Sequence, residues 1–184
     1  LLVMANNFLQ LFIGWEAVGL VSYLLIGFWF TRESAIRANL KAFLINRVGD
    51  LGFLLGISAI FVIVGDLNYN VVFAAAGQMS AINYEILPGY SYSMITLICI
   101  LLFVGAMGKS AQIPLHVWLP DSMEGPTPIS ALIHAATMVI AGIFMVTRLS
   151  PLFEYSDAAL NLLLIIGSLT AFSMGLVAIV QNDI

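Results

Sequence analysis

The chain has 184 residues, of which 61% are hydrophobic and only 9% charged, and its formal net charge is −4. Soluble domains carry about a quarter charged residues, so this composition excludes a water-soluble globular fold and indicates a protein surrounded by lipid. A nucleic-acid partner is not expected either, because there is no basic patch beyond Arg32, Arg37 and Lys41.

Five apolar segments are long enough to cross a membrane, which takes about 20 residues. The bilayer interior offers no water to backbone amides, so each segment is predicted to be a helix. The sequence therefore predicts an all-α, polytopic transmembrane bundle in a single membrane domain over 1–184. The predicted spans are residues 7–30, 36–64, 92–119, 127–147 and 158–180.

Glu16 lies about ten residues into the first span, near mid-depth at a rise of about 1.5 Å per residue. A carboxylate at that depth is costly, and ionisable residues inside membranes are candidates for function. We predict that Glu16 belongs to an ion pathway. The alternative is a packing charge that a basic neighbour neutralises.

The link after the first span carries three basic residues, whereas the link 65–91 carries no Lys or Arg. The positive-inside rule then places the first link on the cytoplasmic or matrix side and the second on the opposite side. Arg148 falls on the outer side in this scheme, which is a minor violation.

Two charges, Arg47 and Asp50, lie three residues apart on one face of the second span. They can form a self-sufficient structural pair. Asp50 is also a candidate relay group, because a carboxylate can bind and release a proton. Both readings stay open on the sequence alone.

The third span combines a lysine with a proline break. Lys109 is followed by four prolines between Gln112 and Pro128, the first of them Pro114. Proline removes a backbone donor and interrupts a helix, so we predict a discontinuous helix with a short second piece at about 115–119. A buried lysine facing Glu16 would be an electrostatic switch, because its hold on a proton depends on the nearby carboxylate.

The fourth span contains His134 about two turns from its start. Histidine titrates near neutral pH, which makes His134 the predicted proton carrier between the fixed charges. His116 is a weaker candidate, and Asp121 and Glu124 are expected to cap helices or to line the cytoplasmic mouth. No metal site is expected, because the two histidines lack the spacing of a metal-binding helix.

The remaining features are negative. Cys99 lies in an apolar run and is interpreted as packing. Sequence motifs of nucleotide, haem and iron–sulfur sites are absent, so no redox centre is expected in this chain. The chain has neither an initiating Met nor a signal peptide, and both ends fall beside apolar segments, so an internal fragment of a longer protein is expected.

Several motifs resemble the antiporter-like membrane subunits of respiratory complex I, the proton-translocating NADH:quinone oxidoreductase. The resemblance covers most of the chain outside the link 65–91. The motifs are Gly14-Trp15-Glu16, Ser22 to Phe28 (SYLLIGF), Lys41-Ala42-Phe43, Asn46 to Asp50 (NRVGD), Gly108 to Gln112 (GKSAQ) and Pro114 to Gly142 (PLHVWLPDSMEGPTPISALIHAATMVIAG).

The resemblance implies a fold of about fourteen helices in two inverted repeats, of which this chain would hold the fifth to ninth. It implies that five residues form the proton pathway, and these are Glu16, Arg47, Asp50, Lys109 and His134. The family's seventh helix is discontinuous, in agreement with the proline argument. Ala17 is a departure, since the family usually has glycine there.

The resemblance also implies a function, namely proton pumping coupled to electron transfer from NADH to quinone. NADH, flavin, iron–sulfur clusters and quinone would be bound by other subunits, and the partners would be other membrane subunits of complex I and the lipid bilayer. The implied location is the bacterial inner membrane, with the mitochondrial inner membrane as the alternative.

Three other readings stay open. A multi-subunit cation/proton antiporter is one, although such relatives typically carry lysine six residues after the histidine of the eighth helix, where this chain has Ile140. A membrane-bound hydrogenase subunit is the second, and an inert truncated product is the third.

Overall fold

The computed structural model describes residues 1–87 and 90–181 and confirms the all-α membrane fold class. Four helical stretches in these residues are long and apolar enough to cross a membrane, and a fifth apolar helix, α5, is shorter, with 16 residues. The four stretches are α1 (Phe8–Ile26), α2 (Glu33–Val64), Thr127–Arg148, and α9 (Asp157–Val180). Where a bilayer would begin and end along them stays a prediction.

The remaining elements are short. The stretch Thr127–Arg148 consists of α6, the π-helix η2 and α7, and α5 precedes it. The bounds are α3 (Tyr69–Ala74), α4 (Ala76–Ala81), β1 (Asn83–Leu87), β2 (Tyr90–Ser93), α5 (Met94–Lys109), η1 (Asp121–Glu124), α6 (Thr127–Ser130), η2 (Ala131–Thr137), α7 (Met138–Arg148) and α8 (Ser150–Phe153).

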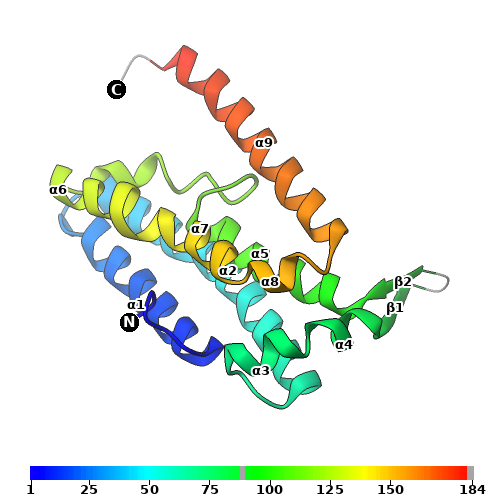
Figure 1. The fold of residues 1–184 in the computed structure, drawn as a ribbon. Coiled ribbons are helices and arrows are strands. Elements are labelled where there is room, and N and C mark those ends of the chain that lie inside the picture. The colour runs from blue at the N-terminus through cyan, green and yellow to red at the C-terminus, as the bar shows by residue number, and fades with distance from the viewer. Residues whose placement is uncertain (88–89, 182–184) are drawn as a thin grey trace.

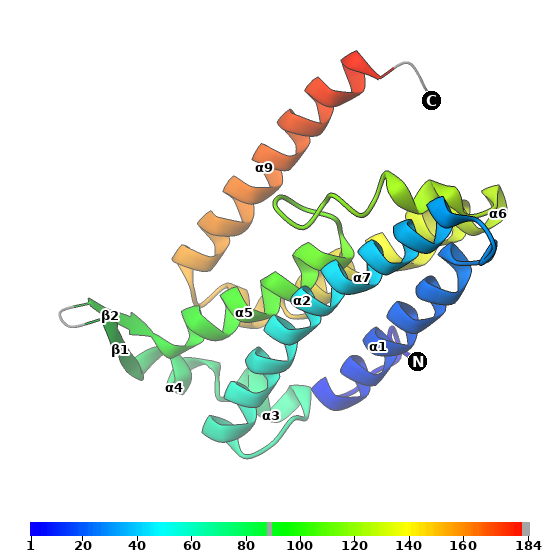
Figure 2. The ribbon, with the colours of Figure 1, turned by 180° about the vertical axis from the view of Figure 1, so that it is seen from behind.

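Helices α2 and α5 form the centre of the bundle, with α1 packed on α2 and α7 on α5 (Figure 1). Their backbones touch because glycines face each other: a Cβ built on Gly49 would lie 3.1 Å from the Gly108 Cα. Small residues allow such close approach between membrane helices. Seen from behind, α9 leaves this bundle after α8 and extends away from it (Figure 2).

The break after α5 is confirmed, but the predicted helical piece at 115–119 is wrong. After Lys109 the chain turns at Ala111, whose φ is +50°, and residues 113–120 form successive turns. Leu115 N–H donates to the Gln112 carbonyl at 2.7 Å. The two residues are three apart, the separation of a turn, rather than four apart as in an α-helix. Pro114 and Pro120 have no backbone N–H, and the five residues between them are too few to form a stable helix of their own. Helical structure resumes only with η1.

The link after α2 contains regular secondary structure. It contains α3, α4 and the antiparallel β1–β2 hairpin. Asp66 organises its start: Oδ1 accepts from the backbone N–H of Leu67 at 2.6 Å and of Asn68 at 2.9 Å. Phe8 N–H donates to the Leu67 carbonyl at 3.0 Å, so this turn also holds the start of α1.

The Asp66 turn is expected to loosen in acid. The hydrogen bond from the Asn68 backbone, and then that from its side chain, holds the pKa of Asp66 below the ordinary 3.8. A depressed folded-state pKa contributes stability above the unfolded value and loses it as pH falls through the folded value. Amide exchange at Leu67 and Asn68 should therefore accelerate in acid beyond its intrinsic pH dependence, and an Asp66→Ala variant should exchange rapidly already at neutral pH. Equal protection in the variant would contradict this.

Candidate functional site

A buried ion pair lies where α1, α2 and α5 meet. Lys109, at the last turn of α5, is only 1% exposed, and its Nζ lies 3.3 Å from Oδ1 and 3.4 Å from Oδ2 of Asp50 on α2. Desolvating a charge is expensive, so a buried lysine and a buried aspartate are tolerated because each neutralises the other. The centre of the site is therefore the ion pair between Asp50, within α2, and Lys109, at the end of α5.

A second pair extends this centre toward the surface of α1. Arg47 Nη1 forms an ion pair with Glu16 Oε2, and the same Nη1 lies 3.8 Å from Oδ2 of Asp50. Both Glu16 and Arg47 are partly exposed. The four side chains thus form a row of alternating charge, Glu16, Arg47, Asp50 and Lys109, in which each member has an opposite charge beside it.

The direct pairing of Glu16 with Lys109 that the sequence suggested is not what the structure shows. Arg47 and Asp50 are interposed between them, because Arg47 and Asp50 lie on the face of α2 turned to both α1 and α5. Helix α1 instead meets Lys109 at Gly19, where a Cβ would come within 2.8 Å of the Lys109 Nζ.

His134 lies apart from this row, on the π-helix η2. Its Nε2 and the Ser122 hydroxyl are 3.0 Å apart, and its Nδ1 is buried without a hydrogen-bond partner among the described protein atoms. Its ring stacks on Trp118, with centroids 6.4 Å apart and planes at 20°. Single π-helical turns in membrane and soluble helices frequently occur at functional sites.

Trp118 connects the histidine to the end of α5. Its indole N–H donates to the carbonyl of Gly108 at 3.0 Å, and Gly108 directly precedes Lys109. The interrupted segment therefore folds back so that a fully buried aromatic ring lies between the backbone at Lys109 and His134.

The two acidic residues after the break pair with polar groups of α2. Lys41 Nζ lies 2.7 Å from Oδ2 of Asp121, and the Ser34 hydroxyl donates to Glu124 Oε2 at 3.1 Å. Both contacts are exposed, at the end of the bundle that bears the basic link. They attach η1 to α2 and take no part in the charged row.

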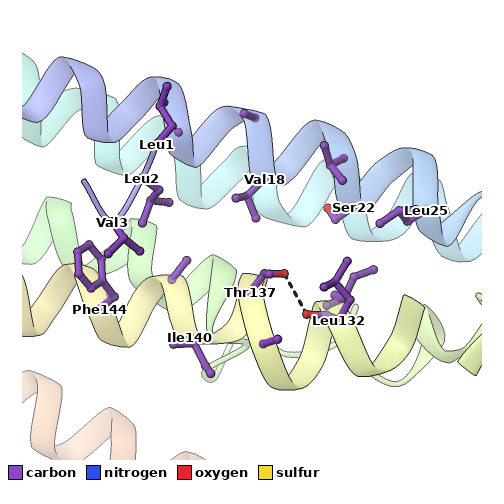
Figure 3. A pocket seen from close by; sticks show the side chains of 16 residues that line it. Leu1, Leu2, Val3, Val18, Ser22, Leu25, Leu132, Thr137, Ile140 and Phe144 are labelled. Carbon is purple, nitrogen blue, oxygen red and sulfur yellow. Dashed lines mark hydrogen bonds between the residues drawn. The ribbon is translucent and has the colours of Figure 1, made fainter. Parts of the chain in front are cut away.

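An apolar pocket of about 440 Å³ separates α1 from η2 and α7 (Figure 3). Its hydroxyls are already satisfied: Ser22 donates to the Gly19 carbonyl at 2.8 Å and Thr137 to the Leu132 carbonyl at 3.0 Å. No charged side chain lines it. The pocket is therefore suited to apolar groups and is separate from the charged row.

Sequence reasoning missed four contributors to the site, which are Trp15, Gly19, Trp118 and Ser122. Trp15 appeared only in the motif Gly14-Trp15-Glu16, and Gly19 was not singled out. Nothing in the one-dimensional pattern shows that Trp15 bonds Asp50 or that Gly19 makes room for Lys109. Trp118 lies on the non-helical segment 113–120 and Ser122 on η1 directly after it, and the proline pattern does not specify the path of either.

Gly19→Ala is expected to displace the Lys109 ammonium. The added methyl would lie within 2.8 Å of Nζ, closer than van der Waals contact allows, and the flexible side chain would have to withdraw. We expect little loss of thermal stability but a several-fold loss of whatever activity depends on the Lys109–Asp50 pair. Gly77→Ala is the control, because its nearest neighbour would be 3.9 Å away. Full activity in Gly19→Ala would show that Lys109 tolerates displacement.

The described geometry, apolar helices around a row of charges beside an interrupted helix, is that of a multi-pass membrane protein. The comparisons with known proteins agree. The family described as "NADH:quinone oxidoreductase/Mrp antiporter, TM" matches residues 5–184, and the chain belongs to this family.

Individual relatives lie within the same family. The chain is 64% identical over 185 residues to NADH-quinone oxidoreductase subunit L of Neisseria meningitidis and 56% identical over 185 residues to NADH-ubiquinone oxidoreductase chain 5 of Marchantia polymorpha. Both matches cover 100% of this chain, but only 27% and 28% of the relatives. The chain therefore spans little more than a quarter of the curated relatives it matches.

A solved structure is also similar. The Mrp complex from Dietzia sp. DQ12-45-1b matches with a TM-score of 0.69 and 30% identity, over 81% of this chain and 15% of that chain. The arrangement of helices described above is therefore also found in part of that Mrp complex.

Proposed function

We propose that this chain is part of a proton-translocating, antiporter-like subunit of NADH:quinone oxidoreductase. The observation that carries the proposal is the row Glu16, Arg47, Asp50 and Lys109, which is buried at its Asp50–Lys109 end and finishes there beside an interrupted helix. Such a row has no packing advantage over apolar side chains, so its retention in lipid favours a transport role. The relatives named for this oxidoreductase support the particular assignment.

The row can couple the charge state of Glu16 to that of Lys109, because its members can exchange ion-pair partners. Arg47 Nη1 already lies 3.8 Å from Asp50 Oδ2, so loss of the Glu16 contact would let Arg47 move toward Asp50. Asp50 would then share its charge with two cations, and Lys109 would hold its proton less tightly. The proton released from Nζ would pass toward His134, whose Nδ1 has no hydrogen-bond partner among the described residues and would accept it in the tautomer that carries its proton on Nε2.

The driving force must come from outside the chain. Moving one charge across the membrane costs about 2.3 kcal/mol per 100 mV, which partner exchange alone cannot repeatedly supply. We propose that NADH oxidation and quinone reduction in other subunits provide it, and that NADH, flavin, iron–sulfur clusters and quinone are bound there. The proposed partners are the neighbouring membrane subunits of that complex, in a bacterial inner membrane or its mitochondrial counterpart.

The test is NADH-driven proton uptake by the assembled enzyme in liposomes, with the full-length chain carrying His134→Gln. Glutamine can keep the Ser122 contact but cannot carry a proton at neutral pH, so proton uptake per NADH oxidised should fall several-fold. His116→Gln is the matched control and is expected to retain most of the uptake. A loss of equal size in both variants, or none in His134→Gln, would contradict the relay.

A second candidate is a subunit of a multi-subunit cation/proton antiporter, which the 30% identity to the Mrp complex favours. The same liposomes distinguish the two functions. If an imposed sodium gradient drives proton movement without NADH, the antiporter reading holds, whereas proton uptake that requires NADH and quinone supports the oxidoreductase.

A further inference from the structure

Trp15 makes a hydrogen bond that the mechanism above does not use. Its indole N–H donates to Oδ1 of Asp50 at 2.8 Å, and the tryptophan side chain is fully buried. A hydrogen bond to an ionised acceptor is about twice as strong as one between neutral groups. An apolar ring of that size would fill the same space, so the polar edge aimed at a carboxylate needs its own explanation.

The ring of Trp15 also faces the partner of that carboxylate. The Lys109 Nζ lies 5.8 Å from the ring centroid, within the range of a cation–π contact, and Phe53 packs on the ring at a centroid distance of 4.8 Å. Trp15 therefore contacts both members of the buried ion pair, one through its N–H and the other through its face.

The surroundings of Asp50 show what the bond achieves. The charged groups that face it are Glu16 from α1, Arg47 from its own helix and Lys109 from α5. Lys109 approaches both carboxylate oxygens, whereas Arg47 approaches only Oδ2. With Oδ1 held by the indole, the carboxylate keeps the orientation in which Oδ2 faces Arg47 while both oxygens stay within 3.4 Å of the Lys109 Nζ.

We propose that Trp15 is a positioning residue for the proton step, holding Asp50 so that it can be exchanged between Arg47 and Lys109. The proposal rests on the proposed function. Because Trp15 and Glu16 are adjacent on α1, one small movement of α1 changes the indole's hold on Asp50 together with the carboxylate's hold on Arg47.

The experiment replaces Trp15 with Phe in the full-length chain of the assembled enzyme, and measures proton uptake per NADH oxidised as a function of pH. Phenylalanine keeps a ring against Phe53 and loses the N–H. Uptake is expected to fall by about three- to tenfold, and its pH profile to be displaced by about one unit, the size expected from losing one charge-assisted hydrogen bond. Trp15→Leu, which also lacks a hydrogen-bond donor, is the second variant if the first does not assemble, and its profile should be displaced too.

Phe53→Leu is the matched control, because it disturbs packing against the same ring without touching the hydrogen bond. It is expected to lower the amount of assembled enzyme and to leave the pH profile in place. In an Asp50→Asn background, Trp15→Phe should add no further displacement, because the charged acceptor is gone.

An unchanged pH profile and unchanged uptake in the Trp15 variant that assembles would overturn the positioning role. So would an equal displacement in Phe53→Leu. The proposed function has a separate test, since it fails if the enzyme pumps normally without the Lys109 ammonium, whatever the Trp15 variants do.

Discussion

Lys109→Met is expected to abolish most proton uptake by the assembled enzyme. Methionine matches the length of the lysine stem, so the space at the end of α5 stays filled, but the proton carrier is lost and Asp50 keeps only Arg47 as a cationic neighbour. We expect at least a tenfold decrease in protons taken up per NADH oxidised, measured in liposomes, with electron transfer still possible. A loss of one proton-transfer group typically costs factors of about 10² or more in such a step.

Lys41→Met is the matched control, since the chain has only these two lysines. Lys41 is exposed and pairs with Asp121 outside the charged row, so its removal should leave uptake within about twofold of the original value. A proton-to-electron ratio that is unchanged in Lys109→Met would refute the role of Lys109 and, with it, the proposed pathway.

Gly105→Ala is expected to destabilise the bundle more than its size suggests. The new Cβ would lie 2.6 Å from the Cβ of Phe53, an atom close to the backbone of α2 that cannot simply rotate away. Overpacking of this kind costs about 1–3 kcal/mol. We expect less assembled protein and a lower midpoint of thermal unfolding in detergent.

Gly167→Ala is the control for this prediction. It makes the same substitution inside α9, where nothing lies within 4 Å of the added Cβ, and alanine is the better helix former by about 1 kcal/mol. Its stability should be unchanged or raised. If both variants unfold at the same temperature as the original chain, the contact between α2 and α5 is looser than its geometry indicates.

The apolar helices could be predicted from sequence, because they follow from the cost of placing polar groups in lipid, while the depth of their charges in a bilayer stays a prediction. That reasoning selected Glu16, Arg47, Asp50, Lys109 and His134, and their assignment to a proton pathway stays a prediction. It also located the break after α5, since Pro114 cannot continue a helix. These conclusions need only residue type and spacing.

The pairing of these charges could not be predicted, because it depends on how helices are rotated about their axes. A span without a clear amphipathic face gives no direction for its charges, so Glu16 was assigned to Lys109, when Arg47 is its partner. The path of residues 113–120 was also out of reach. It includes a hydrogen bond between residues ten apart, from the Trp118 indole to the Gly108 carbonyl, which local propensity does not indicate.

The π-helical turn at His134 has no sequence signal of the kind used here. Nothing in Ala131–Thr137 distinguishes it from an ordinary α-helical run, and the wider turn becomes visible only with the Thr137 hydroxyl bonded to the Leu132 carbonyl five residues earlier. Tertiary packing, rather than propensity, selects such turns.

The glycine contact between α2 and α5 restricts how the molecule can move in operation. With Gly49 and Gly108 touching main chain to main chain, neither helix can slide along the other without a collision. The distance between the backbones that carry Asp50 and Lys109 is therefore expected to stay constant. For the proposed proton step, this contact favours side-chain torsions and a tilt of α1, over about an ångström or two, above a shift by a full helical turn.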